Sequence, residues 1–199
     1  LTGFGGPNGA PTNWFSLLNE NNAAFLKFGN PDRMPYLWRF DLATLEAYSQ
    51  AVEPAFYSVA TRLLARPGDG QVRNIIAITR ADIPLMQSLG VRFLITDYPI
   101  PAPARLTTQL VEPPLSHFVF ELPDPNDGSY SPTNIVVAAD ATDVLRRIAD
   151  PDFDFRKTLV LDEQLDQALQ PAQSTRATLV RGGWRIQAQS KAVSLLLLP

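Results

Sequence analysis

Three aspartates at alternate positions, Asp150, Asp152 and Asp154, form the densest acidic group in the chain. Two carboxylates about 5 to 10 Å apart across a cleft can hydrolyse a glycosidic bond. The alternation also resembles a calcium loop, but the glycine and the distal glutamate of an EF-hand are missing. The simpler interpretation is a solvated turn that ends a helix at Ala149. A free-standing secreted glycan hydrolase with a carboxylate pair is therefore kept as the alternative hypothesis.

The glycines between Gly3 and Gly9 invite comparison with a phosphate-binding loop. A dinucleotide fingerprint requires a glycine where Asn8 stands, a strand before the loop and a helix N-terminus after it. Because only two residues precede Gly3, we predict an ordinary loop here. The chain has no cysteine, which excludes a thiolate metal site, a cysteine nucleophile and a disulfide.

His117 is the only histidine, so a catalytic triad or a zinc site would have to be built around this one imidazole. Its place at the start of an apolar run favours an edge residue of a strand over a ligand or a base. We therefore expect no catalytic residue, no metal and no cofactor in this chain.

Aromatic residues interleaved with polar ones near the N-terminus form a candidate sugar-binding surface. Aromatic rings could stack on sugar rings, or they could form the core that holds a loop-rich segment in place. A separate candidate is Asp97, which follows an apolar run, as ligand-binding residues do in open α/β sheets; the plainer interpretation is that it ends a strand. The candidate ligand-binding residues are Trp14, Tyr36, Trp38, Arg39 and Asp97.

The composition is that of a globular protein with many stiff loops. Hydrophobic residues make up 45 % of the 199 residues and charged residues 19 %, and 18 residues are proline. A net charge of −3 gives no basic face for nucleic acid. The chain has no secretion signal and no apolar run long enough for a membrane span. Both ends look like cuts, so we expect a piece of a longer polypeptide.

The first part of the chain is expected to be loop-rich and helical. Within residues 1–40 we predict mostly loop, with a short helix over residues 14–18. An apolar stripe after Asp41 predicts a long helix that Pro54 interrupts. Thr79 and Asp82 resemble a capping box for a helix that ends at Gly90.

The second part is expected to form strands. A helix over residues 141–148, capped by Asp140, lies between two expected strands and predicts a parallel pair with a crossover. Gly182-Gly183 predicts a hairpin, and residues 192–198 predict a last strand that completes a meander. The expected strands cover residues 91–96, 106–111, 117–122, 134–138, 158–161, 175–181, 184–189 and 192–198.

This order predicts an α+β fold: a loop-rich and helical N-terminal part, a mixed β-sheet with a βαβ unit, and a C-terminal antiparallel meander. We expect residues 1–40 to form a loop-rich aromatic segment and residues 41–199 an α+β domain, the two belonging to one structural unit.

Four segments resemble the extracytoplasmic domain of YfhO-like bacterial membrane proteins, relatives of the type C glycosyltransferases. SLGVRFLITDYPI (88–100) is similar to that family's "lGVryvit" segment, and FVFELPDP (118–125) to its "vyelpnp" pattern. DPDFDFRKTLVLDE (150–163) resembles "dpdfdp…vvle", and SLLLLP (194–199) resembles the strand that leads into "PGW". The resemblance covers roughly residues 35–199.

The resemblance implies a multi-helix membrane enzyme that transfers sugars from a lipid-linked donor to cell-envelope acceptors. Its catalytic carboxylate would lie in an early loop that has no counterpart here, so no catalytic residue is carried over. We expect a soluble domain on the periplasmic face of the bacterial inner membrane, tethered through spans absent from this chain. Its expected partners are a glycan or a lipid-linked sugar, and its expected role is binding or scaffolding without catalysis.

Overall fold

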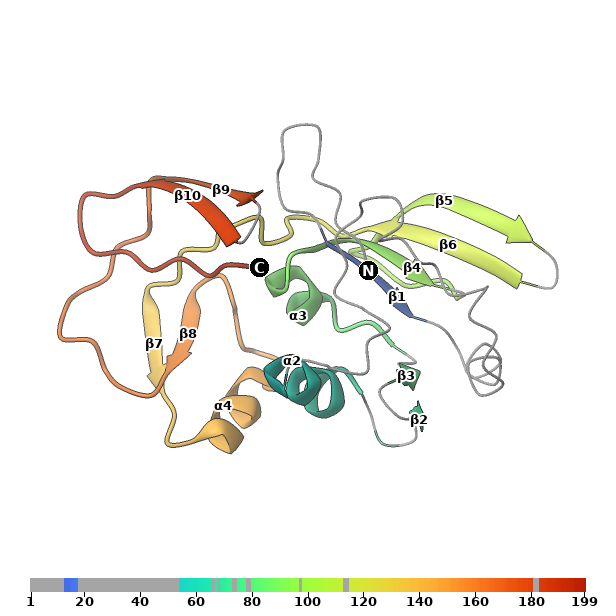
Figure 1. Cartoon of the computed structure of the whole chain (residues 1–199), viewed down its shortest axis with the longest axis horizontal. Coiled ribbons are helices and arrows are strands. Elements are labelled where there is room, and N and C mark those ends of the chain that lie inside the picture. Colours follow the sequence, from blue (N-terminus) through green and yellow to red (C-terminus); the bar gives the residue numbers. More distant parts are fainter. Residues whose placement is uncertain are drawn as a thin grey trace.

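The computed structural model describes residues 13–17, 54–65, 67, 69–72, 75–77, 80–96, 98–112, 115–180 and 183–199. The helical elements are α2 (Pro54–Val59), the π-helical turn η3 (Ala60–Leu64), α3 (Ile83–Ser88) and α4 (Ala141–Ile148). The strands are β1 (Asn13–Leu17), β2 (Gly70–Val72), β3 (Ile75–Ala77), β4 (Val91–Thr96), β5 (Arg105–Glu112), β6 (Leu115–Glu121), β7 (Asn134–Val137), β8 (Thr158–Leu161), β9 (Ser174–Val180) and β10 (Gly183–Gln189). Few helices and several sheets of mixed direction confirm the α+β fold (Figure 1). In this part of the chain, no helix combines the length and the apolar character that a bilayer span requires.

A four-stranded sheet in the order β1-β4-β6-β5 forms the largest sheet of the described chain. β4 is central, parallel to β1 and antiparallel to β6. The prediction of a helix over residues 14–18 is wrong, because Asn13–Leu17 pairs with β4 as a strand. Five residues are too few for a stable isolated helix, and Trp14 and Phe15 favour strands when a partner strand is present.

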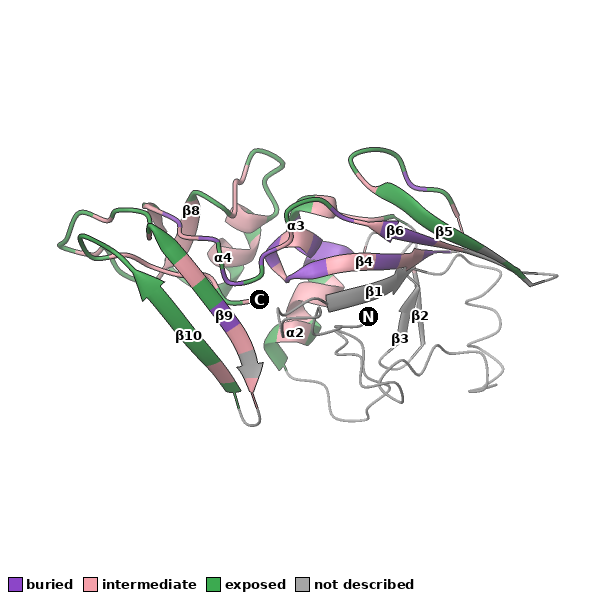
Figure 2. Ribbon diagram, turned by 90° about the horizontal axis from the view of Figure 1, so that it is seen from above, coloured by how far each residue is buried: buried purple, intermediate pink, exposed green. Residues whose placement is uncertain are grey.

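The core lies where α3 and η3 pack against the central strand. Met86 of α3 and Val91 and Leu94 of β4 are fully buried. Burying each such side chain contributes about 1.5–3 kcal/mol. Figures 1 and 2 show α2 and α3 between the sheet and the β7–β8 unit, with the buried residues gathered on α3, β4 and β6. The buried cluster comprises Leu63, Leu64, Leu85, Met86, Val91, Leu94, Ile100, Phe120 and Leu122.

Pro54 and Gly90 mark the ends of two helices, as the sequence predicted. α2 begins at Pro54, which suits a first helical position because its missing N–H has no partner there. The predicted helix before it lies outside the described residues. Gly90, with φ of +73°, ends the α3 region as expected. The capping box was misassigned: Asp82 is itself the N-cap and accepts a hydrogen bond from Leu85 N at 3.1 Å.

The predicted β–α–β unit is confirmed as a separate two-stranded sheet. β7 and β8 pair in parallel, and α4 connects them. The Asp140 side chain caps α4 by accepting from Asp143 N at 2.8 Å. Leu145 and Ile148 of α4 pack against the buried core, which joins this unit to the rest of the fold.

The C-terminal hairpin is confirmed, but the meander is wrong. β9 and β10 pair with Val180 opposite Gly183, so Gly183 is the first residue of β10 and not part of the connection, contrary to the prediction from Gly182-Gly183. Residues 190–199 contain no strand. Leu197 N instead donates to Tyr130 O at 2.9 Å, and Leu195 O accepts from Ser131 Oγ at 2.8 Å. Backbone that is hydrogen-bonded to the loop before β7 does not add a strand to β10.

Asn126 joins three parts of the fold through its buried side chain. Its Nδ2 donates to Ser88 O at 3.1 Å and to Leu197 O at 3.0 Å, and its Oδ1 accepts from Gly128 N at 3.0 Å. Its backbone N also donates to Gln87 O at 2.8 Å. The C-terminal end of α3, the loop after β6 and the chain terminus therefore meet at one amide that has no exposed surface.

The substitution Asn126→Ala is expected to lower the free energy of unfolding by about 2–4 kcal/mol, because buried polar groups in three segments lose their partners together. Urea unfolding followed by circular dichroism measures the loss. Asn134→Ala, which removes an exposed amide of β7, is the matched control and should change stability by less than about 0.5 kcal/mol. Equal effects of the two substitutions would contradict this role for Asn126.

Candidate ligand-binding groove

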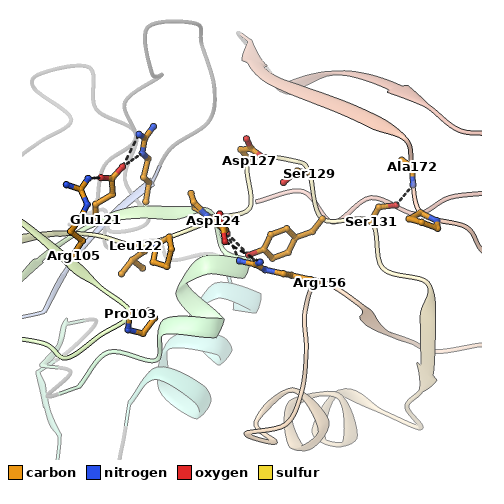
Figure 3. A pocket seen from close by; sticks show the side chains of 15 residues that line it. Pro103, Arg105, Glu121, Leu122, Asp124, Asp127, Ser129, Ser131, Arg156 and Ala172 are labelled. Atoms are coloured by element: carbon orange, nitrogen blue, oxygen red, sulfur yellow. Dashed lines mark hydrogen bonds and ion pairs between the residues drawn. The ribbon is translucent and has the colours of Figure 1, made fainter.

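A groove of about 930 Å³ lies along the loop that connects β6 with β7. In Figure 3, Arg105 and Glu121 lie at one end, Asp124 and Arg156 in the middle, and Ser131 with Ala172 at the other end. The groove is lined by Arg92, Pro103, Arg105, Glu121, Leu122, Pro123, Asp124, Pro125, Asp127, Ser129, Tyr130, Ser131, Arg156, Pro171 and Ala172.

The loop after β6 holds its shape through special backbone positions. Asp124 and Gly128 have positive φ, of 42° and 89°. A Cβ added at Gly128 would lie 2.4 Å from the Cβ of Ala177 in β9. Gly128 therefore meets both a conformational and a steric requirement. The close approach fixes the distance between this loop and the C-terminal hairpin.

Two arginines share one carboxylate at the first end of the groove. Arg92 Nε donates to Glu121 Oε1 at 3.0 Å, and Arg105 Nη2 contacts Glu121 Oε2. The sheet creates this cluster, because Arg105 and Glu121 are cross-strand partners of β5 and β6. Burial of Glu121 opposes its ionisation, but the hydrogen bonds from Arg92 and Arg105 outweigh burial and lower the pKa of the carboxyl. Glu121 is therefore ionised at neutral pH.

Arg156 occupies the middle of the groove and uses its whole guanidinium group. Its Nε donates to Tyr130 Oη at 3.2 Å, its Nη2 donates to Asp124 O at 3.0 Å, and its Nη1 lies 3.6 Å from Asp124 Oδ2. The guanidinium carbon also lies 5.2 Å from the centre of the Tyr130 ring. Burial raises the pKa of the Tyr130 hydroxyl, although the bond from Arg156 acts in the opposite direction. These contacts hold Tyr130 as part of the wall.

The acidic turn that was considered for catalysis supports Arg156. Asp150 Oδ1 accepts from Asp152 N at 3.0 Å, and Asp154 Oδ1 accepts from Arg156 N at 2.9 Å. Asp154 Oδ2 pairs with Lys157 Nζ at 2.9 Å. The three carboxylates belong to a turn after α4 and do not line the groove. Among the described residues, no group of three or more acidic or histidine side chains has the arrangement of a metal site.

Of the five ligand-binding candidates named from the sequence, only Trp14 lies among the residues that the structure describes. Trp14 lies in β1 with its backbone opposite Phe93 of β4. β4 ends at Thr96, immediately before Asp97, as the strand-end interpretation expects. The remaining candidates lie outside the described residues: Tyr36, Trp38, Arg39 and Asp97.

Sequence reasoning missed the residues that line the groove. The run from Pro123 to Tyr130 is rich in turn-forming residues, and a long polar loop of this kind is a recognised place for function. The pairing of Arg105 with Glu121 was harder to predict from the sequence than the position of this loop. Simple counting from the Pro113-Pro114 turn places Leu106 opposite Glu121, and an irregularity between Leu106 and Thr108 shifts the register.

Replacing Glu121 with glutamine should reduce the acid sensitivity of the fold. A carboxyl whose pKa is lowered on folding stabilises the protein above its unfolded pKa, and this contribution is lost as pH falls through the folded value. The wild type should therefore lose more stability than Glu121→Gln between pH 6 and about pH 3, by about 1 kcal/mol or less because both arginines are solvated. Urea unfolding at several pH values measures the difference. Glu163→Gln, at an exposed glutamate, is the control and should follow the wild type; identical profiles for all three proteins would contradict the expectation.

Comparison with known proteins gives no further assignment. No protein-family model matches the chain, and neither a curated protein nor a solved structure matches it.

Proposed function

We propose that this chain is the extracytoplasmic domain of a multi-spanning bacterial membrane protein related to glycosyltransferases. Its role is to bind a glycan or sugar acceptor at the periplasmic face of the inner membrane, without catalysis by this chain alone. The observation that carries the proposal is the groove, because all four segments that resemble the YfhO-like family contribute to it or contact its wall.

The convergence follows segment by segment. The first segment supplies Arg92 from β4, and the second supplies Glu121 and the start of the groove loop. The third supplies Arg156 through the acidic turn. The fourth is the C-terminal stretch whose Leu197 N donates to Tyr130 O. Segments that lie far apart in the sequence thus meet around one surface.

The chemistry of the lining suits a saccharide. The volume of about 930 Å³ lies within the range of small-molecule sites, which are usually dominated by apolar side chains. This groove instead alternates arginines, carboxylates and serine hydroxyls with proline rings. Hydroxyl groups of a sugar can donate to carboxylates and accept from guanidinium groups, while its carbon faces contact the prolines.

Glu121 is poorly suited to act as the general acid of a glycosidase. A glycosidase requires a carboxylic acid whose pKa is raised, so that a proton is available for the leaving group. Glu121, which lines the groove, has the opposite shift because two arginines stabilise its ionised form. It therefore serves better as a hydrogen-bond acceptor than as a general acid.

A panel of bacterial cell-envelope saccharides, presented as an array and followed by calorimetry, should identify at least one ligand. Asp127→Ala removes an exposed carboxylate of the groove and should weaken binding about tenfold, the cost of a charge-assisted hydrogen bond. Asp166→Ala, at another exposed aspartate, is the control and should bind like the wild type. No binding to any saccharide would contradict the proposal. Loss of binding only in Trp38→Ala or Tyr36→Ala would contradict the groove as its location.

The complete reading frame around this fragment provides a separate test. Apolar spans of about 20 residues should flank the domain, because that length crosses the hydrocarbon core of a membrane. Sequencing the gene checks this directly. A frame without any such span would contradict the membrane assignment, even if saccharide binding is found.

A further inference from the structure

The first end of the groove holds one more positive charge than negative charge. Arg92 and Arg105 face a single carboxylate, Glu121. The Arg105 side chain is 71 % exposed and that of Arg92 is 40 % exposed, whereas the Glu121 side chain is 20 % exposed. The carboxylate thus lies deeper than the two cations, and the unbalanced charge is presented to solvent at the groove.

Arg105 also keeps hydrogen-bond donors for a ligand. An arginine has five N–H donors. Arg156 contacts protein acceptors through all three of its guanidinium nitrogens. By contrast, within the part of the chain that the structure describes, the side chain of Arg105 pairs only with Glu121, through one nitrogen. Arg156 and Arg105 therefore differ in function: Arg156 is held by the wall of the groove, and Arg105 is available to a ligand.

The remaining charges of the groove limit the ligand to one anionic group at this end. The charge of Arg156 is balanced by Asp124, at 3.6 Å. Asp127 adds an exposed negative charge farther along the loop and would repel a second anion. One surplus positive charge matches a carboxylate, which carries a single negative charge, better than a phosphate monoester, which carries about −1.5 to −2 at neutral pH.

We propose that the groove selects an acidic saccharide, a sugar chain with one terminal uronic acid, whose carboxylate binds Arg105 and Arg92 while its neutral rings extend along the loop toward Ser131. This inference rests on the proposed glycan-binding function and specifies its substrate class. Arginine suits the role because its planar donor pair matches a carboxylate in a bidentate arrangement.

The test compares three sugars by calorimetry: a disaccharide ending in glucuronic acid, the same disaccharide with its carboxyl reduced to an alcohol, and glucose 6-phosphate. The acidic disaccharide should bind at least tenfold more tightly than its reduced form in low salt. The preference should shrink as ionic strength rises, because the arginines are exposed. Equal binding of the acidic and reduced forms, or preference for the phosphate, would overturn the inference while leaving glycan binding intact. No binding of either disaccharide would count against both proposals.

Two variants with opposite expected effects separate charge recognition from a structural role. Arg105→Ala should weaken binding of the acidic form at least tenfold more than binding of the reduced form, so that the preference for the acidic form is lost. Glu121→Gln removes the competing carboxylate and should strengthen binding of the acidic form several-fold without strengthening that of the reduced form. Arg176→Ala, at an exposed arginine of β9, is the matched control and should keep the wild-type preference. Unchanged selectivity in Arg105→Ala, or weaker acid binding in Glu121→Gln, would overturn the inference.

Discussion

The buried amide of Asn126 joins segments that lie far apart in the sequence. It binds the carbonyl groups of Ser88 and Leu197, and it accepts from Gly128 within its own loop. Its neighbours in the chain, Pro125 and Asp127, both line the groove. The same hydrogen bonds that anchor the loop to the core therefore set the position of the groove. A polar residue at the centre of the fold links stability with the candidate site.

The local patterns of the sequence predicted most of the elements, because those elements depend on neighbouring residues. The alternating apolar residues after Gly90 predicted β4, and Asp140 predicted the start of α4. Long-range pairing was not predictable in the same way. Residues 13–17 became a strand because β4 offered an edge. Residues 192–198 did not form a strand, because backbone groups in that stretch are hydrogen-bonded to Tyr130 O and Ser131 Oγ.

The candidate site was harder to predict than the fold because its residues come from distant segments. Arg92, Glu121 and Arg156 are unremarkable in the sequence, and each becomes informative only when the other two are beside it. The irregularity in β5 conceals the pairing of Arg105 with Glu121 from any count of residues. Conversely, the acidic run from Asp150 to Asp154 suggested a catalytic carboxylate pair in the sequence. In the structure, two of its three carboxylates accept hydrogen bonds from backbone N–H groups of their own turn.

The prolines of the groove have a consequence for how it recognises a ligand. Pro103, Pro123, Pro125 and Pro171 line the groove, and none of them has a backbone N–H that could donate to a ligand. Donors must therefore come chiefly from a few side chains, which makes selectivity unusually dependent on the arginines. Proline also has a fixed φ, so these positions have little backbone freedom to lose on association. These positions should thus add little to the entropic cost of binding, and the groove should change little in shape when a ligand binds.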